Sequence, residues 1–499
     1  MNIAIVNAID VRPPATRPLV NGTTSFQRVM EFARGLPGVE QVTVLASTAA
    51  GPLPETPRNC RVIARAQWSV ADLTSEMEKA CQGFEDVFYV FADCPFLDPA
   101  IAQTMHANHR KYWADYTFAD GFPLGLTPEI LTRDVVSRLR GMSAEDRGRP
   151  DREALFAIIR KDINSFDIET ELAPVDLRLL RVSLTADTER NFLLLRRLIE
   201  KGGSDTESIC RLLQEEPRVL RTLPAFFPIQ IVERCPYACS YCPYPAFAGD
   251  VTHKNGAMDA QKFSALVAKI AAFCGDAVID VSLWGEPSLH PEIFAVLSSV
   301  LGTPGLSLVI ETSGLGWGRD AFRRLKDSFP TQPTWIVSLD ASSEEMYRRL
   351  RGPGYAEAVK TAEILLSLFP STTWVQAVRM KENEEDLEVF YKSWKTKTDN
   401  IIIQKYDSFS TFLPDRKVAD LSPVRRFPCW HLKRDMAILI DGTVPMCRED
   451  VRVEHRVGNA FTEDLAVIWE RGERAYRNHI AESYPPLCAG CDEYYTYNF

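Results

Sequence analysis

The sequence has no hydrophobic run long enough to span a membrane and no start typical of a secreted protein. Its 499 residues contain no apolar stretch of the ~18–20 residues that a spanning helix needs. The opening MNIAIVNAID has neither the basic region nor the cleavage site of a signal peptide. We therefore expect a cytoplasmic protein with no membrane partner. Because that compartment is reducing, the twelve cysteines should be ligands or buried thiols rather than disulfides.

An excess of positive charge is also missing. The formal net charge is -10 and the sequence pI is about 5.4, which argues against nucleic acid as a main partner. Low-complexity tracts and repeats of 20–50 residues are absent as well, so a solenoid or propeller is not expected. The composition is that of a globular protein, with 45% hydrophobic and 25% charged residues. The length predicts about three domains.

Residues 1–200 alternate between strand-like and helix-like patterns, which predicts an α/β domain with a mainly parallel sheet. The strand-like runs include NIAIVNA, QVTVLAS, VFYVFADCPFL and RVSLTADT. Asp93 and Asp187 each follow one of these runs, and the carboxyl edge of such a sheet is where ligands bind. Residues 201–226 are interpreted as a linker with one short helix, because Gly and Pro mark its ends.

A second strand–helix series occupies residues 227–420. It contains about six βα units, enough to form a partial (β/α)6 barrel, with the site at the carboxyl ends of its strands. Residues 421–499 differ, because cysteine, proline and aromatic residues become frequent and the periodic patterns shorten. We expect a small cysteine-rich α+β domain there. Within it, MAILIDGTV is interpreted as a β-hairpin that turns at Asp441-Gly442.

The stretch CPYACSYCPYP contains three cysteines, Cys235, Cys239 and Cys242, directly after the first strand of the expected barrel. Thiolates select zinc, copper(I) or iron–sulfur clusters. A closed zinc site takes four ligands, so three thiolates leave one coordination position open. Taken alone, the spacing also fits a surface loop with incidental cysteines or half of a zinc site.

The spacing C-x3-C-x2-C after a first barrel strand resembles the radical S-adenosylmethionine (SAM) superfamily. This resemblance implies a [4Fe-4S] cluster on the three cysteines, with one open iron that binds SAM. Further motifs match the family: WGEP at 284–287, SLDA at 338–341 and Arg351-Gly352, while IETSG departs from it with Ser313 where Asn is frequent. The residues that the resemblance assigns to SAM are Tyr241, Gly285, Glu286, Ser338 and Arg351.

A second set of cysteines, Cys429, Cys447, Cys488 and Cys491, lies in the last part of the sequence. Four thiolates complete either a structural zinc site or a fully ligated iron–sulfur cluster. The spacing resembles the SPASM/twitch extension of radical SAM enzymes, in a version that holds one auxiliary [4Fe-4S] cluster. The whole arrangement resembles the group called spiro-SPASM proteins.

Residues 1–200 resemble nucleotide-sugar cytidylyltransferases, which have the glycosyltransferase-A fold and form an α/β sandwich. The resemblance implies that Asp93 and Asp187 hold Mg²⁺. The family's glycine-rich phosphate loop is replaced here by NAIDVRPPATRPLVNG, which has no glycine before Gly22. We therefore expect a degenerate domain whose use of Mg²⁺ or a nucleotide is open.

The leading hypothesis is a radical SAM enzyme that forms a 5'-deoxyadenosyl radical and abstracts hydrogen from a peptide, protein or small-molecule substrate. The expected cofactors are SAM, the SAM-binding [4Fe-4S] cluster and one auxiliary [4Fe-4S] cluster that takes part in electron transfer. The expected reductant is a flavodoxin or a ferredoxin. Two alternatives remain: a bifunctional protein whose active N-terminal cytidylyltransferase acts on a sugar-like substrate that the barrel modifies, and a non-catalytic scaffold stabilised by zinc. The sequence assigns no catalytic residue and no oligomeric state.

Overall fold

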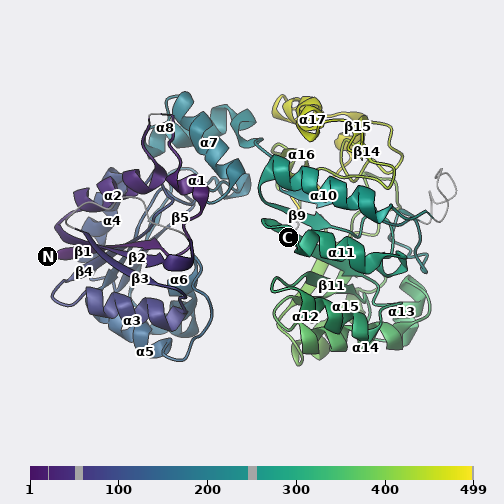
Figure 1. Cartoon of the computed structure of the whole chain (residues 1–499), viewed down its shortest axis with the longest axis horizontal. Coiled ribbons are helices and arrows are strands. Elements are labelled where there is room, and N and C mark those ends of the chain that lie inside the picture. The colour runs from purple at the N-terminus through teal and green to yellow at the C-terminus, as the bar shows by residue number, and fades with distance from the viewer. Residues whose placement is uncertain (21, 51–59, 245–255, 497–499) are drawn as a thin grey trace. The chain divides into compact units, whose positions relative to one another are not determined.

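The computed structural model describes residues 1–20, 22–50, 60–244 and 256–496. The chain forms two compact units, Met1–Thr222 and Leu223–Phe499. Each unit has its own sheet (Figure 1). No described helix is both long and apolar enough to cross a lipid bilayer.

The first unit is built on a seven-stranded sheet of order β3-β2-β1-β4-β6-β5-β7. All neighbouring strands are parallel except β6, which runs antiparallel to both β4 and β5. The strands are β1 Asn2–Ala8, β2 Val39–Ser47, β3 Cys60–Arg65, β4 Asp86–Phe91, β5 Tyr116–Asp120, β6 Glu129–Thr132 and β7 Ile168–Leu172. Strand β1, which lies between β2 and β4, is buried along its whole length, as its mainly apolar sequence predicts.

Helices cover both faces of this sheet (Figure 1). On one face, α2 and α4 pack on the side chains of Ala4, Val6 and Val44. On the other face, α3, α5 and α6 pack on Ile3 and Ile5. The helices of the unit are α1 Pro13–Thr16, α2 Ser25–Gly35, α3 Val70–Ala80, α4 Pro99–Lys111, α5 Arg133–Met142, α6 Ala154–Ile159, α7 Glu189–Glu200 and α8 Thr206–Glu215.

The segment predicted to be a linker, residues 201–226, contains α8, and α8 packs inside the first unit. Ile209 and Leu213 of α8 join an apolar cluster with Leu195 and Leu198 of α7. Asp98 also accepts a hydrogen bond from the backbone N–H of Thr206 (3.0 Å). This segment therefore adds to the core of the unit that precedes it.

The second unit contains a six-stranded, all-parallel sheet of order β13-β12-β11-β10-β9-β8. Strictly sequential order with parallel strands is the arrangement of a partial βα barrel, as the sequence predicts. The strands are β8 Phe226–Pro228, β9 Ala277–Asp280, β10 Leu306–Thr312, β11 Thr334–Ser338, β12 Thr373–Arg379 and β13 Ile401–Lys405.

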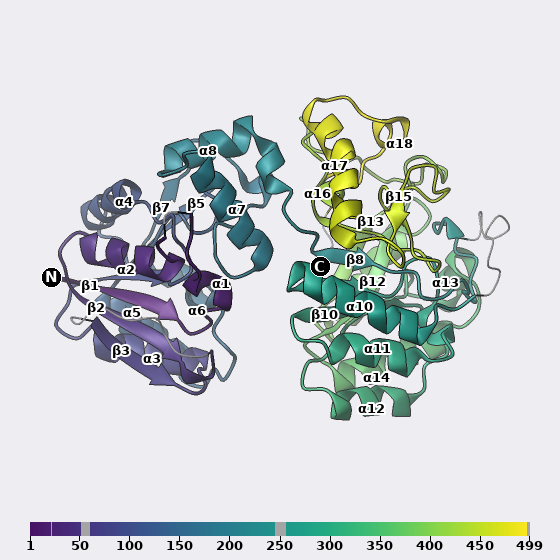
Figure 2. The same ribbon diagram turned by 45° about the horizontal axis from the view of Figure 1, so that its top comes forward.

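Helices lie along the outer face of this sheet (Figure 2). Alternate strand residues such as Ile279, Ile310 and Val337 pack against them in the main core of the unit. Because side chains alternate along a strand, the residues between these ones point to the inner face of the barrel. The helices are α10 Ala260–Cys274, α11 Ile293–Leu301, α12 Arg319–Ser328, α13 Glu344–Leu350, α14 Tyr355–Leu368 and α15 Glu384–Lys395.

The C-terminal part of the second unit contains short elements and one long helix, α17. Lys269 of α10 donates hydrogen bonds to the carbonyls of Ala460 (2.6 Å) and Glu463 (2.8 Å), which attaches this part to the barrel. The elements are α16 Trp430–Arg434, β14 Thr443–Pro445, β15 Arg456–Asn459, α17 Leu465–Ile480 and α18 Pro486–Ala489.

Two local predictions are wrong. RVSLTADT forms no strand: its residues make a single bridge, from Ser183 to Leu124, and the run begins with Arg181 in the left-handed region (φ 50°). The predicted hairpin MAILIDGTV also differs. Its turn is present, with Gly442 at φ 84°. However, Ile438 pairs with Ile229 beside β8, and β14 pairs with β15.

Candidate functional site

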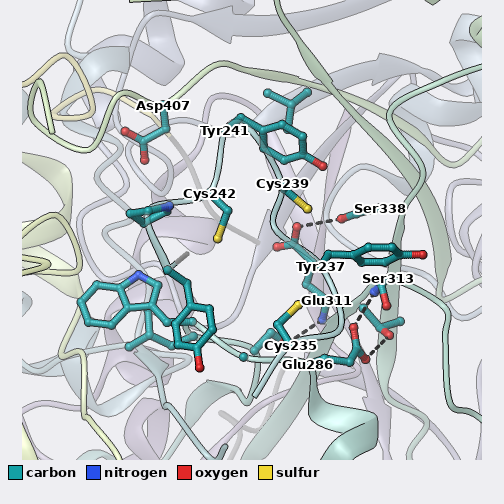
Figure 3. A pocket seen from close by; sticks show the side chains of 18 of the residues that line it. Cys235, Tyr237, Cys239, Tyr241, Cys242, Glu286, Glu311, Ser313, Ser338 and Asp407 are labelled. Atoms are coloured by element: carbon teal, nitrogen blue, oxygen red, sulfur yellow. Dashed lines mark hydrogen bonds between the residues drawn. The ribbon is translucent and has the colours of Figure 1, made fainter. Parts of the chain in front are cut away.

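Three cysteines line one cavity at the carboxyl end of the barrel sheet. Cys235, Cys239 and Cys242 follow β8 in the chain, and the cavity that they line has a volume of about 220 Å³. Their sulfur atoms point toward the same space (Figure 3). Among the described residues that line this cavity there is no fourth cysteine. The donor set is therefore three soft thiols around an accessible space.

Burial raises the pKa of each of these thiols. The pKa reaches about 11 for Cys235 and about 12 for Cys242. The negative charge of the neighbouring Cys239 thiolate also raises both of these pKa values. The pKa of Cys239 is raised by burial as well, with Arg351 acting in the opposite direction. A bound metal centre supplies the positive charge that such a group of thiolates lacks, so the set fits a metal cluster.

The WGEP segment forms a strained turn on the same cavity. Trp284 lies in the left-handed region (φ 51°). A Cβ atom at Gly285 would lie 2.1 Å from the carbonyl oxygen of Val232, so the close approach of two backbone segments requires glycine here. Glu286 is 3% exposed. Its carboxylate accepts hydrogen bonds from the Thr312 hydroxyl (2.6 Å) and from the backbone N–H of Ser313 (2.8 Å).

Tyr241 and Arg351 belong to one buried network centred on Asp340. Arg351 forms an ion pair with Asp340 and donates a hydrogen bond to the Tyr241 hydroxyl (2.6 Å). The Tyr241 hydroxyl in turn donates to Asp340 (2.5 Å). Asp340 is fully buried, has a φ of 63° and accepts from the backbone N–H of Val378 (2.7 Å). The network therefore joins the cysteine loop, the SLDA segment and the end of α13.

Ser338 lies on the inner face of the barrel. Its hydroxyl donates to the carboxylate of Glu311 (2.9 Å), which also accepts from the amide of Gln376 (2.7 Å). Glu311 and Ser338 both line the cavity with the three cysteines. The structure thus brings all five residues that the sequence assigns to SAM, namely Tyr241, Gly285, Glu286, Ser338 and Arg351, to the cavity of the cysteine trio.

The other four cysteines lie together in the C-terminal part. Cys429 precedes α16, Cys447 follows β14, and Cys488 and Cys491 lie in and after α18. Burial is the main cause of a raised pKa for all four, to about 12 for Cys429 and about 11 for Cys488. The charges of Cys491, Cys488 and Cys429 each raise the pKa of Cys447 further, so the four thiols form one group.

This group adjoins the cavity of the trio. Arg448, the residue after Cys447, lines that cavity and pairs with Asp407 (3.3 Å) and Glu449 (3.0 Å). In the described ranges, no three Cys, His, Asp or Glu side chains are close enough to hold a single metal ion. Four thiols are the type of donor that iron–sulfur clusters take.

Comparison with known protein families agrees with this geometry. Residues 229–393 match the Radical SAM superfamily, and residues 429–492 match SPASM, an iron–sulfur cluster-binding domain. The chain belongs to the radical SAM superfamily. It is therefore a radical SAM enzyme with a SPASM domain, and these two domains imply SAM and iron–sulfur clusters as its cofactors.

Individual relatives extend the comparison to more of the chain. A protein of Treponema pallidum (strain Nichols), whose function is uncharacterised, is 41% identical over 358 residues, which cover 69% of this chain and 98% of the relative. Streptococcus suis SuiB bound to its precursor peptide SuiA is 14% identical, with a TM-score of 0.42, covering 68% of this chain and 78% of SuiB. A cytidylyltransferase from Leptospira borgpetersenii is 16% identical, with a TM-score of 0.35, covering 44% of this chain and 95% of that protein.

The first unit of this radical SAM enzyme has a separate cavity of about 230 Å³, lined by both Asp93 and Asp187. Arg152 lies at the same cavity. It forms an ion pair with Asp93, and its guanidinium is 3.9 Å from the Asp187 carboxylate. Burial raises the pKa of Asp93, Asp187 adds to this rise, and Arg152 opposes it. The two aspartates predicted to bind Mg²⁺ are thus brought together, with a guanidinium beside both.

Several residues at the cavity of the cysteine trio were missed by sequence reasoning. Asp340 stands inside a quoted motif, but only the fold shows that it holds Tyr241 and Arg351. Asp280 and Glu311 line the cavity from the ends of β9 and β10. Burial and the charge of Glu311 raise the pKa of Asp280 to about 7. The available signal was a carboxylate at or near the end of a mainly apolar strand.

Proposed function

We propose that Cys235, Cys239 and Cys242 bind a [4Fe-4S] cluster whose open iron holds SAM in the adjoining cavity. The observation that carries the proposal is that the three thiols and all five expected SAM-binding residues line the same cavity. When bound, the cluster and SAM would supply radical hydrogen abstraction by a 5'-deoxyadenosyl group, with the electron coming from an external reductant. The protein's own residues bind and orient the cofactor.

Each SAM contact has a physical reason in this proposal. Glu286 is held by Thr312, Ser313 and the backbone N–H of Ser288, and the oxygen that accepts only from Ser313 keeps a lone pair for the SAM ammonium. Gly285 allows the backbone to approach closely. Arg351, which Asp340 holds in place, presents its remaining N–H groups to the SAM carboxylate, and Tyr241 provides an aromatic wall for the adenine. Ser338 approaches the ribose from the end of β11.

We further propose that Cys429, Cys447, Cys488 and Cys491 bind one auxiliary [4Fe-4S] cluster. Full ligation by four thiolates favours electron transfer over direct binding of the substrate. The position of Arg448, between the cavity and Cys447, supports an exchange of electrons between the two centres. In this division, residues 227–420 form the catalytic barrel and residues 421–499 form the auxiliary-cluster domain. The substrate is a peptide, protein or small molecule, and a flavodoxin or ferredoxin is the reductant.

For the first 200 residues we propose a domain that has kept the nucleotidyltransferase-like fold and lost or changed its activity. The observation that favours this over an active cytidylyltransferase is the ion pair between Asp93 and Arg152, which places a protein cation where Mg²⁺ would bind. The loop after β1 also starts the short helix α1 with Pro13 and has no glycine to cradle phosphates. Titration of the full chain with CTP and Mg²⁺ tests this: measurable binding would contradict a degenerate domain.

The cluster assignment is tested by iron content after anaerobic reconstitution. The wild-type chain should bind about eight irons, since each cubane holds about four. Cys239→Ala and Cys447→Ala should each lose about half of them, whereas the matched control Cys60→Ala in the first unit should lose none. Addition of SAM should change the electron paramagnetic resonance spectrum of the reduced wild type, of Cys447→Ala and of Cys60→Ala, and should not change that of Cys239→Ala. Zinc in place of iron, or fewer than about four irons per wild-type chain, would support the scaffold hypothesis instead.

A further inference from the structure

The inner face of the barrel carries a polar residue on each of five neighbouring strands, at or near the carboxyl end of four of them. The register of the strands shows that these residues share this face. Ser338 pairs directly with Gln376, and on the other neighbouring strands the polar residue lies two positions beyond the direct partner. Side chains two positions apart on a strand point to the same face. We call this set the polar layer. It consists of Asp280, Glu311, Ser338, Gln376 and Gln404.

Two members of the polar layer are carboxylates, and both line the cavity of the cysteine trio. Hydrogen bonds reach Asp280 from the backbone N–H of Ser282 (3.0 Å) and Glu311 from Ser338 and Gln376. In the part of the chain that the structure describes, no ion pair forms with either carboxylate. Glu311 is exposed and Asp280 half-buried, and both residues line the cavity.

The cations of the cavity are already paired elsewhere. Lys405 lies 3.1 Å from Asp492, and Arg448 lies 3.3 Å from Asp407. Arg351 forms its ion pair with Asp340. Arg448 lowers the pKa of Asp280, but by less than Glu311 raises it. Two carboxylates close to each other, without a cation between them, create a negative region beside the proposed SAM position.

We propose that Asp280 and Glu311 bind a protonated amino group of the substrate, and that this enzyme therefore acts on a substrate that carries an amine close to the hydrogen that is removed. The inference rests on the proposed function, because the cavity is a substrate site only if SAM binds beside it. An ammonium group placed between the two carboxylates forms charge-assisted hydrogen bonds with both and removes their mutual repulsion. The neutral amide of Gln376 and the hydroxyl of Ser338 hold the Glu311 carboxylate without neutralising it, and the backbone N–H of Ser282 holds that of Asp280.

The test compares two probes of similar shape, cyclohexylamine and cyclohexanol. Their affinities are measured by titration calorimetry on the reconstituted full chain with saturating SAM, without reductant, at about pH 8, where the amine is protonated. We expect the wild type to bind the amine at least about tenfold more tightly than the alcohol. The double variant Asp280→Asn/Glu311→Gln should bind the amine and the alcohol with about equal affinity. The matched control Asp327→Asn/Glu345→Gln removes two exposed carboxylates of the same unit and should keep the preference.

Equal affinity of the wild type for the two probes, or no binding of the amine, would overturn the inference. It would also be overturned if Asp280→Asn/Glu311→Gln retained the preference, or if this variant lost SAM affinity more than about twofold, because the carboxylates would then serve the cofactor. The wild-type comparison stands even if the double variant fails to fold. Iron content and SAM cleavage, measured on the same preparation, report on the proposed function separately, since binding of the amine needs neither turnover nor reductant.

Discussion

The guanidinium of Arg351 donates a hydrogen bond to the hydroxyl of Tyr241, with 2.6 Å between nitrogen and oxygen. The two residues are 110 positions apart in the sequence. Their contact places the cysteine loop against the end of α13, and Asp340 binds both partners. The loop that carries the cysteine trio is thereby attached to the barrel wall by a buried, charged network.

This network predicts a large cost for removing its cation. Arg351→Met leaves the Asp340 carboxylate buried without its ion pair, which should lower the free energy of unfolding of the second unit by about 3–5 kcal/mol. Denaturant unfolding of the full chain measures this change. The double variant Arg351→Met/Asp340→Asn should recover part of the loss, while Arg349→Met, at an exposed position of α13, should change stability by less than about 0.5 kcal/mol. An equal effect of Arg349→Met and Arg351→Met would refute the role of the network.

A second prediction concerns the glycine of the WGEP turn. Gly285→Ala introduces a Cβ atom 2.1 Å from the carbonyl oxygen of Val232, so the turn must move. We expect a loss of about 1–3 kcal/mol in stability, because backbone must shift to relieve the overlap, together with weaker SAM binding. Gly318→Ala is the control: no atom lies within 4 Å of its added Cβ. Equilibrium dialysis with SAM and thermal unfolding measure both effects, and wild-type SAM affinity in Gly285→Ala would contradict the turn's role.

A third prediction concerns the pH dependence of the first unit. Burial raises the pKa of Glu129 from 4.5 to about 7, with a further rise from Glu153, although Tyr116 donates a hydrogen bond to its carboxylate. The folded chain therefore binds more protons than the unfolded chain between these two values. This contribution to stability is fully present below about pH 4.5 and is lost as the pH rises through about 7.

Glu129→Gln should remove this dependence, because glutamine stays neutral. At pH 8 the variant should be more stable than the wild type by on the order of 1–3 kcal/mol, and the difference should shrink toward pH 5. Hydrogen exchange of peptides from β4 and β6, corrected for the intrinsic rate, measures this locally. A difference between the two proteins that does not change from pH 5 to pH 8 would show that Glu129 is ionised in the folded state throughout.

Local sequence patterns predicted the α/β class, the six strands of the barrel and the cavity-lining residues in family motifs. The reason is physical: alternation within strands and spacing within loops are short-range properties, and the parallel order follows from the βα repeat. Gly285, Glu286 and Ser338 lie on one cavity because Ser338 is the last residue of β11 and the other two lie in the loop that follows β9.

Long-range pairings could not be predicted in the same way. Nothing near Ile438 in the sequence indicates that it pairs beside β8 with Ile229, some 200 residues earlier. RVSLTADT has the composition of a strand, but its backbone groups bond to Asp93 and Leu124 rather than to a strand along its length. The carboxylates at Asp280 and Glu311 were missed because their inward direction follows from the register of strands that are neighbours only in space.

Formation of 5'-deoxyadenosine tests the central claim most directly. The full chain, reconstituted anaerobically, is incubated with SAM and dithionite, and the nucleoside is measured by chromatography. We predict its formation by the wild type and by the control Cys60→Ala, and its loss in Cys239→Ala, because the open iron on the trio of thiolates is then missing. Formation of 5'-deoxyadenosine by Cys239→Ala at the wild-type rate, or none by an iron-loaded wild type, would contradict the account.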